Sequence, residues 1–169
     1  MKLELKKIRP SAVDTAVEKA EKYRDLNQPF EAESICRDVL DASPDHPGAL
    51  RTLGLALTDQ FEGKGKGRYA EVMETFARLP DAYERMFYYG IACERQGKAQ
   101  LREGRPLQSS LPLFEKALVH FEEAERLRPE GNDDALLRWN SVVRTLRAHP
   151  EYATVGSRPE FDLGSDSPP

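Results

Sequence analysis

Small residues and prolines recur along this chain at nearly constant intervals, and this recurrence constrains the fold more than any other feature. Ala20, Gly54 and Gly90 are successive small residues in helix-forming stretches, 34 and then 36 residues apart. Pro44 and Pro80 each stand ten residues before the next of these small residues. A repeated interval of this length indicates stacked copies of one supersecondary unit.

The hydrophobic pattern inside each unit has the period of an α-helix. In the stretch "PGALRTLGLALTDQF", Leu50, Leu53, Gly54 and Leu57 stand at positions i, i+3, i+4 and i+7. A proline, Pro44, ends the helical stretch that precedes it. No window longer than a few residues alternates in the manner of a half-buried strand. The sequence therefore predicts an all-α fold.

This pattern resembles the tetratricopeptide repeat (TPR), in which a helical hairpin of about 34 residues carries a small residue in its first helix and a proline at its end. The resemblance covers roughly residues 11–147. It implies antiparallel helical hairpins stacked as an α-solenoid of about seven helices. The sequence departs from the family pattern in lacking the usual tryptophan, in placing Lys19 in an apolar slot, and in two insertions.

The resemblance also divides the chain into parts. Residues 1–10 are an N-terminal extension, and residues 148–169 are an acidic tail rich in Pro, Gly and Ser that we expect to be disordered. Between them, the TPR-like domain comprises repeats at about 11–46, 47–80 and 81–131 and a closing helix at 132–147.

Two details follow from this division. Repeat three contains fifteen extra residues, which we expect to lengthen its two helices into a projecting hairpin. Gly90 should lie where these helices approach closely, so that a larger residue there would overpack the contact. Trp139, the only tryptophan, should be buried against the end of repeat three.

The stretch "EGKGKGRY", residues 62–69, has the glycines and lysines of a phosphate-binding loop. Such a loop needs a strand leading into it and a Ser or Thr after its lysine, and this stretch has neither. We interpret it as an over-long turn between two helices, with Gly63 capping the first helix and Arg68 starting the second.

The sequence contains no recognisable set of catalytic residues. Cys36 and Cys93 occupy helix-packing positions and are better explained as small buried hydrophobic residues than as nucleophiles. The three histidines, His46, His120 and His149, are scattered, which favours solvent-exposed bystanders at His46 and His149. We therefore expect no enzyme activity, no bound metal and no cofactor.

Charge and hydropathy limit the classes of partner that the chain is expected to bind. The formal net charge is −4 and the sequence pI is about 5.5, which argues against general nucleic-acid binding. No stretch has the apolar length of a signal peptide or a membrane span. A cytoplasmic protein without a membrane partner is the expectation.

Several hydrophobic and charged residues of the first helices lie off the predicted core stripe. The resemblance implies that they line a concave groove that binds a partner, where an aromatic and aliphatic patch rimmed by charge suits recognition. The alternative for Phe87 and Ile91 is packing against the adjacent repeat or the closing helix. The groove candidates are Arg51, Leu55, Phe87, Tyr88, Ile91 and Arg95.

The carboxylate clamp known from chaperone-binding TPR proteins is absent, because its lysine and asparagine positions hold Val17, Glu21 and Thr52. Acids outnumber bases at the inferred groove positions, with Glu94 counted among the acids, which favours a partner with basic and apolar residues. The leading hypothesis is a non-catalytic adaptor, assembly factor or chaperone-like scaffold. The alternative is a small enzyme, or its regulatory subunit, with the groove as a cleft. Self-association into a homo-oligomer is compatible with both.

Overall fold

The computed structural model describes residues 3–62 and 67–152. Over these two segments the chain forms helices and no strand, so the all-α prediction is confirmed. A short 3-10 helix, Pro10–Ala12, comes first. The α-helices that follow are α1 (Val13–Asp25), α2 (Pro29–Ala42), α3 (Pro47–Thr58), α4 (Tyr69–Ala77), α5 (Ala82–Arg102), α6 (Leu107–Leu127) and α7 (Asp134–Arg147).

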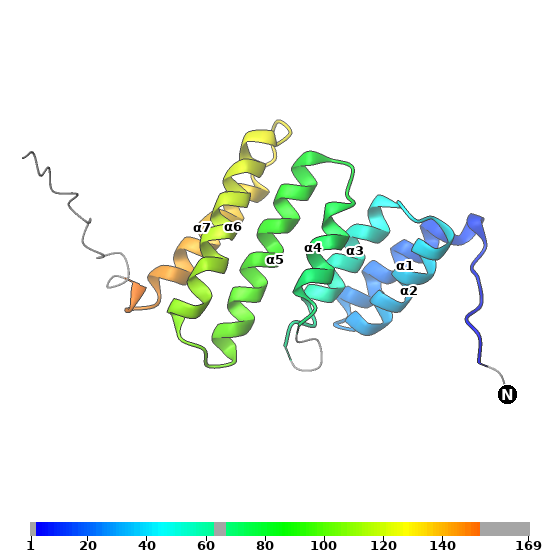
Figure 1. The fold of residues 1–169 in the computed structure, drawn as a ribbon. Coiled ribbons are helices and arrows are strands. Elements are labelled where there is room, and N and C mark those ends of the chain that lie inside the picture. The colour runs from blue at the N-terminus through cyan, green and yellow to red at the C-terminus, as the bar shows by residue number, and fades with distance from the viewer. Residues whose placement is uncertain (1–2, 63–66, 153–169) are drawn as a thin grey trace, which may run out of the picture.

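The helices lie side by side in chain order, and each packs mainly against the helix before it and the helix after it (Figure 1). In addition, α3 contacts α1 and α5, and α5 contacts α7. The first helix of each pair and the last helix of the chain therefore form one continuous face, which we call the odd-helix face.

Local sequence signals set where the helices begin. Pro29 and Pro47 stand in the first turns of α2 and α3, where a missing N–H costs nothing. Asp81 caps α5 by accepting a hydrogen bond from the Glu84 N–H at 2.8 Å. His46 caps α3 through its Nδ1, which accepts from the Ala49 N–H at 3.2 Å. His46 is therefore a structural residue, and the expectation of a bystander there was wrong.

The recurring glycines mark close contacts between paired helices. A Cβ added to Gly90 on α5 would lie 2.5 Å from a ring carbon of Phe121 on α6, which confirms the expected close approach. Gly54 on α3 meets Phe76 on α4 even more closely. Both phenylalanines are fully buried. The second and third hairpins thus share the same contact, a phenylalanine ring of the second helix packed closely against a glycine of the first.

The long hairpin predicted for repeat three is present, because α5 and α6 each have 21 residues and only a short turn separates them. Trp139 differs from its expectation, since it is 38% exposed. It shares a helix face with Val142 and Leu146, which are buried in the core between α5, α6 and α7. No described helix follows α7 to cover the outer part of the indole ring.

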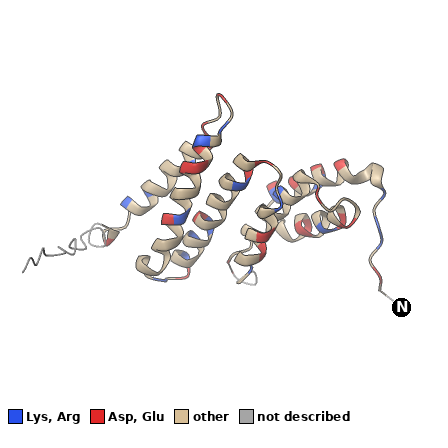
Figure 2. Ribbon diagram, turned by 45° about the horizontal axis from the view of Figure 1, so that its top comes forward, with Lys and Arg blue, Asp and Glu red and all other residues tan. Residues whose placement is uncertain are grey.

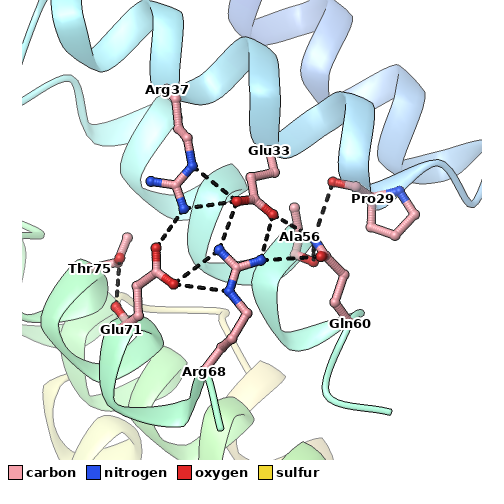
Figure 3. A network of polar contacts seen from close by, with 8 residues as sticks. All are labelled: Pro29, Glu33, Arg37, Ala56, Gln60, Arg68, Glu71 and Thr75. Atoms are coloured by element: carbon pink, nitrogen blue, oxygen red, sulfur yellow. Dashed lines mark hydrogen bonds and ion pairs between the residues drawn. The ribbon is translucent and has the colours of Figure 1, made fainter. Parts of the chain in front are cut away.

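A polar network joins α2, the end of α3 and the start of α4 (Figure 3). Arg68 donates to both carboxylate oxygens of Glu33, at 2.7 and 2.8 Å, and its Nε donates to Glu71 at 3.0 Å. Arg37 bridges the same two carboxylates. Gln60 donates to Glu33 at 2.9 Å and accepts from Arg68.

This network bears on the glycine-lysine stretch. The element before it is helix α3 and the element after it is α4, which begins directly after Arg68. The helices on both sides of the stretch are as predicted, whereas residues 63–66, with the expected capping role of Gly63, lie outside the described residues. The guanidinium of Arg68 binds Glu33 of α2 and Glu71 of α4 and so connects these two helices. Because both carboxylates already bind it, Arg68 is not available to a phosphate.

The network predicts acid sensitivity. Hydrogen bonds from Arg68, Gln60 and Arg37 outweigh the effect of burial and lower the pKa of Glu33 from 4.5 to about 2. A lowered carboxylate pKa adds stability that is complete above about pH 4.5 and is lost as the pH falls toward about 2. Urea unfolding should therefore show the wild type losing about 1–3 kcal/mol more than Glu33→Gln across this window. Equal losses would mean that the network does not hold Glu33 ionised.

Candidate functional site

Two neighbouring hollows lie on the odd-helix face. The first, of about 280 Å³, lies between α1, α3 and α5 and is lined by Glu21, Arg24, Asp25, Arg51, Thr52, Leu55 and Tyr88. The second, of about 350 Å³, lies at the C-terminal ends of α1 and α3 and extends over α5 to α7. Its lining is Asn27, Thr58, Asp59, Phe61, Glu62, Glu94, Arg95, Lys98, Ala99, Arg102 and Arg138. We call them the α1/α3 hollow and the α5/α7 hollow.

The structure brings four of the six groove candidates to these hollows. Arg51, Leu55 and Tyr88 line the α1/α3 hollow, and Arg95 lines the α5/α7 hollow. Leu55 and Tyr88 are only partly exposed, because their inner atoms pack against the cores on both sides. They supply the apolar part of a lining that is otherwise mostly charged.

The other two candidates pack between helices, which was the alternative to a place in the groove. Ile91 is 2% exposed and packs with Phe114, so its assignment to a binding groove was wrong. Phe87 is half-buried and lies in an aromatic stack, with ring centroids 5.8 Å from Tyr83 and 6.0 Å from Phe121. Both side chains fill the space between α5 and the helices packed against it, and neither lines a hollow.

The two arginine candidates are fixed by partners on other helices. Arg51 of α3 forms an ion pair with Glu84 of α5. Arg95 of α5 donates to Thr58 at 2.7 Å and also to the Asp59 carboxylate. Neither side chain is a freely exposed charge, so reversing its sign would disturb the packing between α3 and α5.

Asp59 is the shared acceptor of the odd-helix face. Arg24 donates to it from α1 at 2.6 Å while Arg95 donates to it from α5. Burial lowers the pKa of Arg95, and the positive charges of Arg24 and Arg138 lower it further, whereas Asp59 raises it. Positive charge is therefore crowded around this carboxylate.

Glu94 lies at the base of the α5/α7 hollow and is fully buried. One carboxylate oxygen accepts from Lys98 at 2.5 Å, and the other lies 3.5 Å from the Arg138 guanidinium of α7. That second oxygen has no hydrogen-bond partner in the part of the chain that the structure describes. Glu94 therefore does not present a negative charge at the surface of the groove, contrary to the sequence-based count of groove acids.

Sequence reasoning missed three cations of the second hollow: Lys98, Arg102 and Arg138. A signal for two of them exists, because Arg95, Lys98 and Arg102 stand at i, i+3 and i+7 and so share one face of a helix. Arg138 carries no such signal. It comes from α7, and only the packing of α7 on α5 places it beside Glu94.

The nucleophilic side chains lie away from the hollows. Burial raises the pKa of the Cys36 thiol to about 12 and also raises the pKa of Cys93, which contacts the Tyr69 hydroxyl at 3.1 Å. Both thiols stay protonated at neutral pH, as expected of cysteines that serve as small core residues. Across residues 3–62 and 67–152, no group of three metal-ligating side chains comes together.

No described helix is both long enough and apolar enough to cross a membrane. No protein-family model matches the sequence, and a search of curated proteins finds no similar one.

Proposed function

We propose that this chain is a TPR-like, non-catalytic interaction module of the cytoplasm that binds a segment of a partner protein on its odd-helix face. Two lines of support come from the hairpins and from the hollows. The proposal includes a role as an adaptor, an assembly factor or a chaperone-like scaffold.

The hairpins support the TPR-like part of the proposal. Helices pair in chain order, and the glycines that suggested the repeat lie in the first helices, facing phenylalanines of the second helices. A recurring sequence interval therefore coincides with a recurring physical contact. The same arrangement leaves α1, α3, α5 and α7 side by side with room for a ligand across them.

One observation carries the binding proposal: two hollows meet on the same face and are lined by polar side chains held in place by partners on neighbouring helices. Arg24, Asp59 and Arg95 connect three helices across the boundary between the hollows. Side chains that are already ordered lose less conformational entropy when a ligand binds them. Leu55 and Tyr88 add the apolar surface that supplies affinity.

A capture experiment tests the proposal. The chain with Arg51→Gln, which removes the charge without reversing it, should retain fewer proteins from a cell lysate than the wild type, whereas its stability should change by only about 0–1 kcal/mol because the Arg51–Glu84 pair is partly exposed. Arg126→Gln is the matched control, since Arg126 is an exposed arginine on α6. Loss of the same proteins by both variants, or by neither, would count against the odd-helix face as the binding surface.

A further inference from the structure

The ion pairs of the odd-helix face are distributed unequally between its two hollows. At the boundary between the hollows, Asp59 forms ion pairs with Arg24 of the α1/α3 hollow and with Arg95 of the α5/α7 hollow. Glu94 likewise serves both Lys98 and Arg138. Two carboxylates thus pair with four cations, three of which line the α5/α7 hollow. Arg102 pairs with Glu62 and does not change this surplus. The charged side chains that line the α5/α7 hollow are four cations and three carboxylates, an excess of one positive charge, although the whole chain has a formal net charge of −4.

In the α1/α3 hollow, by contrast, the charged side chains without an ion-pair partner in the described chain are acidic. Arg51 is paired with Glu84, and the guanidinium of Arg24 is bonded to Asp59 at the boundary with the other hollow. Glu21 and Asp25 remain, both exposed at the surface, and neither forms an ion pair with any residue that the structure describes. Figure 2 shows acidic and basic residues interspersed over the helices. The polarity of this face therefore depends on which side chains line the hollows and how they pair.

We infer that the odd-helix face binds a partner segment whose own charges are separated, with basic residues over the α1/α3 hollow and acidic residues over the α5/α7 hollow. This inference rests on the proposed function and specifies the partner's chemistry and where its charges lie on the face. Complementary charge lowers the free energy of the correct arrangement and opposes the reversed one, in which like charges would meet. A partner with basic residues along its whole length would be repelled by the cations at the second hollow, so the basic and apolar partner suggested by the sequence also needs an acidic part.

The buried carboxylate of Glu94 holds cations of the α5/α7 hollow in fixed positions. Because Glu94 lies beneath the hollow and binds Lys98 from its own helix and Arg138 from α7, it orients two cations toward one space. Its second oxygen lacks a hydrogen bond within the described chain and is itself inaccessible to solvent, so the negative charge of Glu94 acts through the two cations. An acidic side chain of the bound segment would lie on these two cations.

The test uses labelled peptides of identical composition and measures their binding to the full chain by fluorescence anisotropy at low ionic strength. One peptide has a block of lysines at its N-terminal end and a block of glutamates at its C-terminal end, the second has the blocks exchanged, and the third alternates the two residues. We expect one of the block peptides to bind about tenfold more tightly than the alternating peptide. Equal binding of all three would overturn the inference.

Substitutions locate the contacts. Glu21→Gln with Asp25→Asn, and separately Arg102→Gln, should each weaken the preferred block peptide several-fold and reduce the salt dependence of binding. Arg126→Gln on α6 is the control and should leave binding unchanged. Melting temperatures of all variants exclude unfolding as the cause, and Arg102 and Arg126 have almost equally exposed side chains.

Other outcomes have definite meanings. If polyglutamate alone or a single-stranded oligonucleotide bound as tightly as the preferred block peptide, the α5/α7 hollow would be a general anion site and the inference would fail. If the peptides did not discriminate while capture of lysate proteins still depended on Arg51, the inference would fail and the proposed function would stand. Loss of both dependences would remove the odd-helix face from consideration.

Discussion

Replacing Gly54 with leucine is expected to lower the free energy of unfolding by about 3 kcal/mol or more, at or above the upper end of the usual cost of overpacking. A Cβ at this position would overlap three ring carbons of Phe76, which is fully buried and has no space into which to move. Because the clash is with a rigid ring between α3 and α4, the two helices must separate to relieve it. Chemical unfolding of the purified variant measures this loss directly.

An alanine series at the glycines provides the internal control. The added Cβ would lie closest to a ring at Gly54, 2.5 Å from Phe121 at Gly90, and 2.9 Å from Phe114 at Gly97. Alanine gains about 1 kcal/mol of helix propensity over glycine at each position, so the net loss should fall in that order and approach zero at Gly97. A loss at Gly97 as large as that at Gly54 would contradict the helix spacing seen in the structure.

Replacing Phe121 with alanine is expected to cost about 3–5 kcal/mol, the range for removing a buried aromatic side chain. Phe121 lies on the backbone of Gly90 and also contacts the Phe87 ring, so its loss opens a cavity between α5 and α6. Phe30→Ala is the matched control, since Phe30 is 57% exposed and its truncation should cost less than about 1 kcal/mol. Similar losses for the two variants would place Phe121 outside the core.

A double-mutant cycle tests the contact itself. Gly90→Ala should destabilise the wild type but have little cost in the Phe121→Ala background, because the ring that the new Cβ would meet is gone. Additive effects would show that the two residues do not touch. This cycle also tests the recurring glycine–phenylalanine contact on which the TPR-like part of the proposed function depends.

The repeating sequence pattern determined the helical class, the approximate helix boundaries and the long third hairpin. Helix period and proline position are local properties, which act through backbone geometry whatever the rest of the chain does. The close approach at Gly90 could also be predicted, because a small residue recurring in a helix is needed where another helix comes near. The places of Arg51, Leu55, Tyr88 and Arg95 on the odd-helix face could be predicted as well, because the helical period puts them off the core stripe of their own helices.

Tertiary packing determined which residues are buried, and the helical period of the sequence alone does not give this. Helix α5 contacts α3, α4, α6 and α7, so more than one of its faces is covered, and Ile91 and Glu94 are buried although they lie off the predicted core stripe. Trp139 stays partly exposed because no described helix covers α7. The charge of the groove was also a tertiary property, since Arg138 meets Glu94 only when α7 packs on α5. Sequence spacing fixes how residues are arranged around one helix, and the number of neighbouring helices determines which of those residues meet solvent.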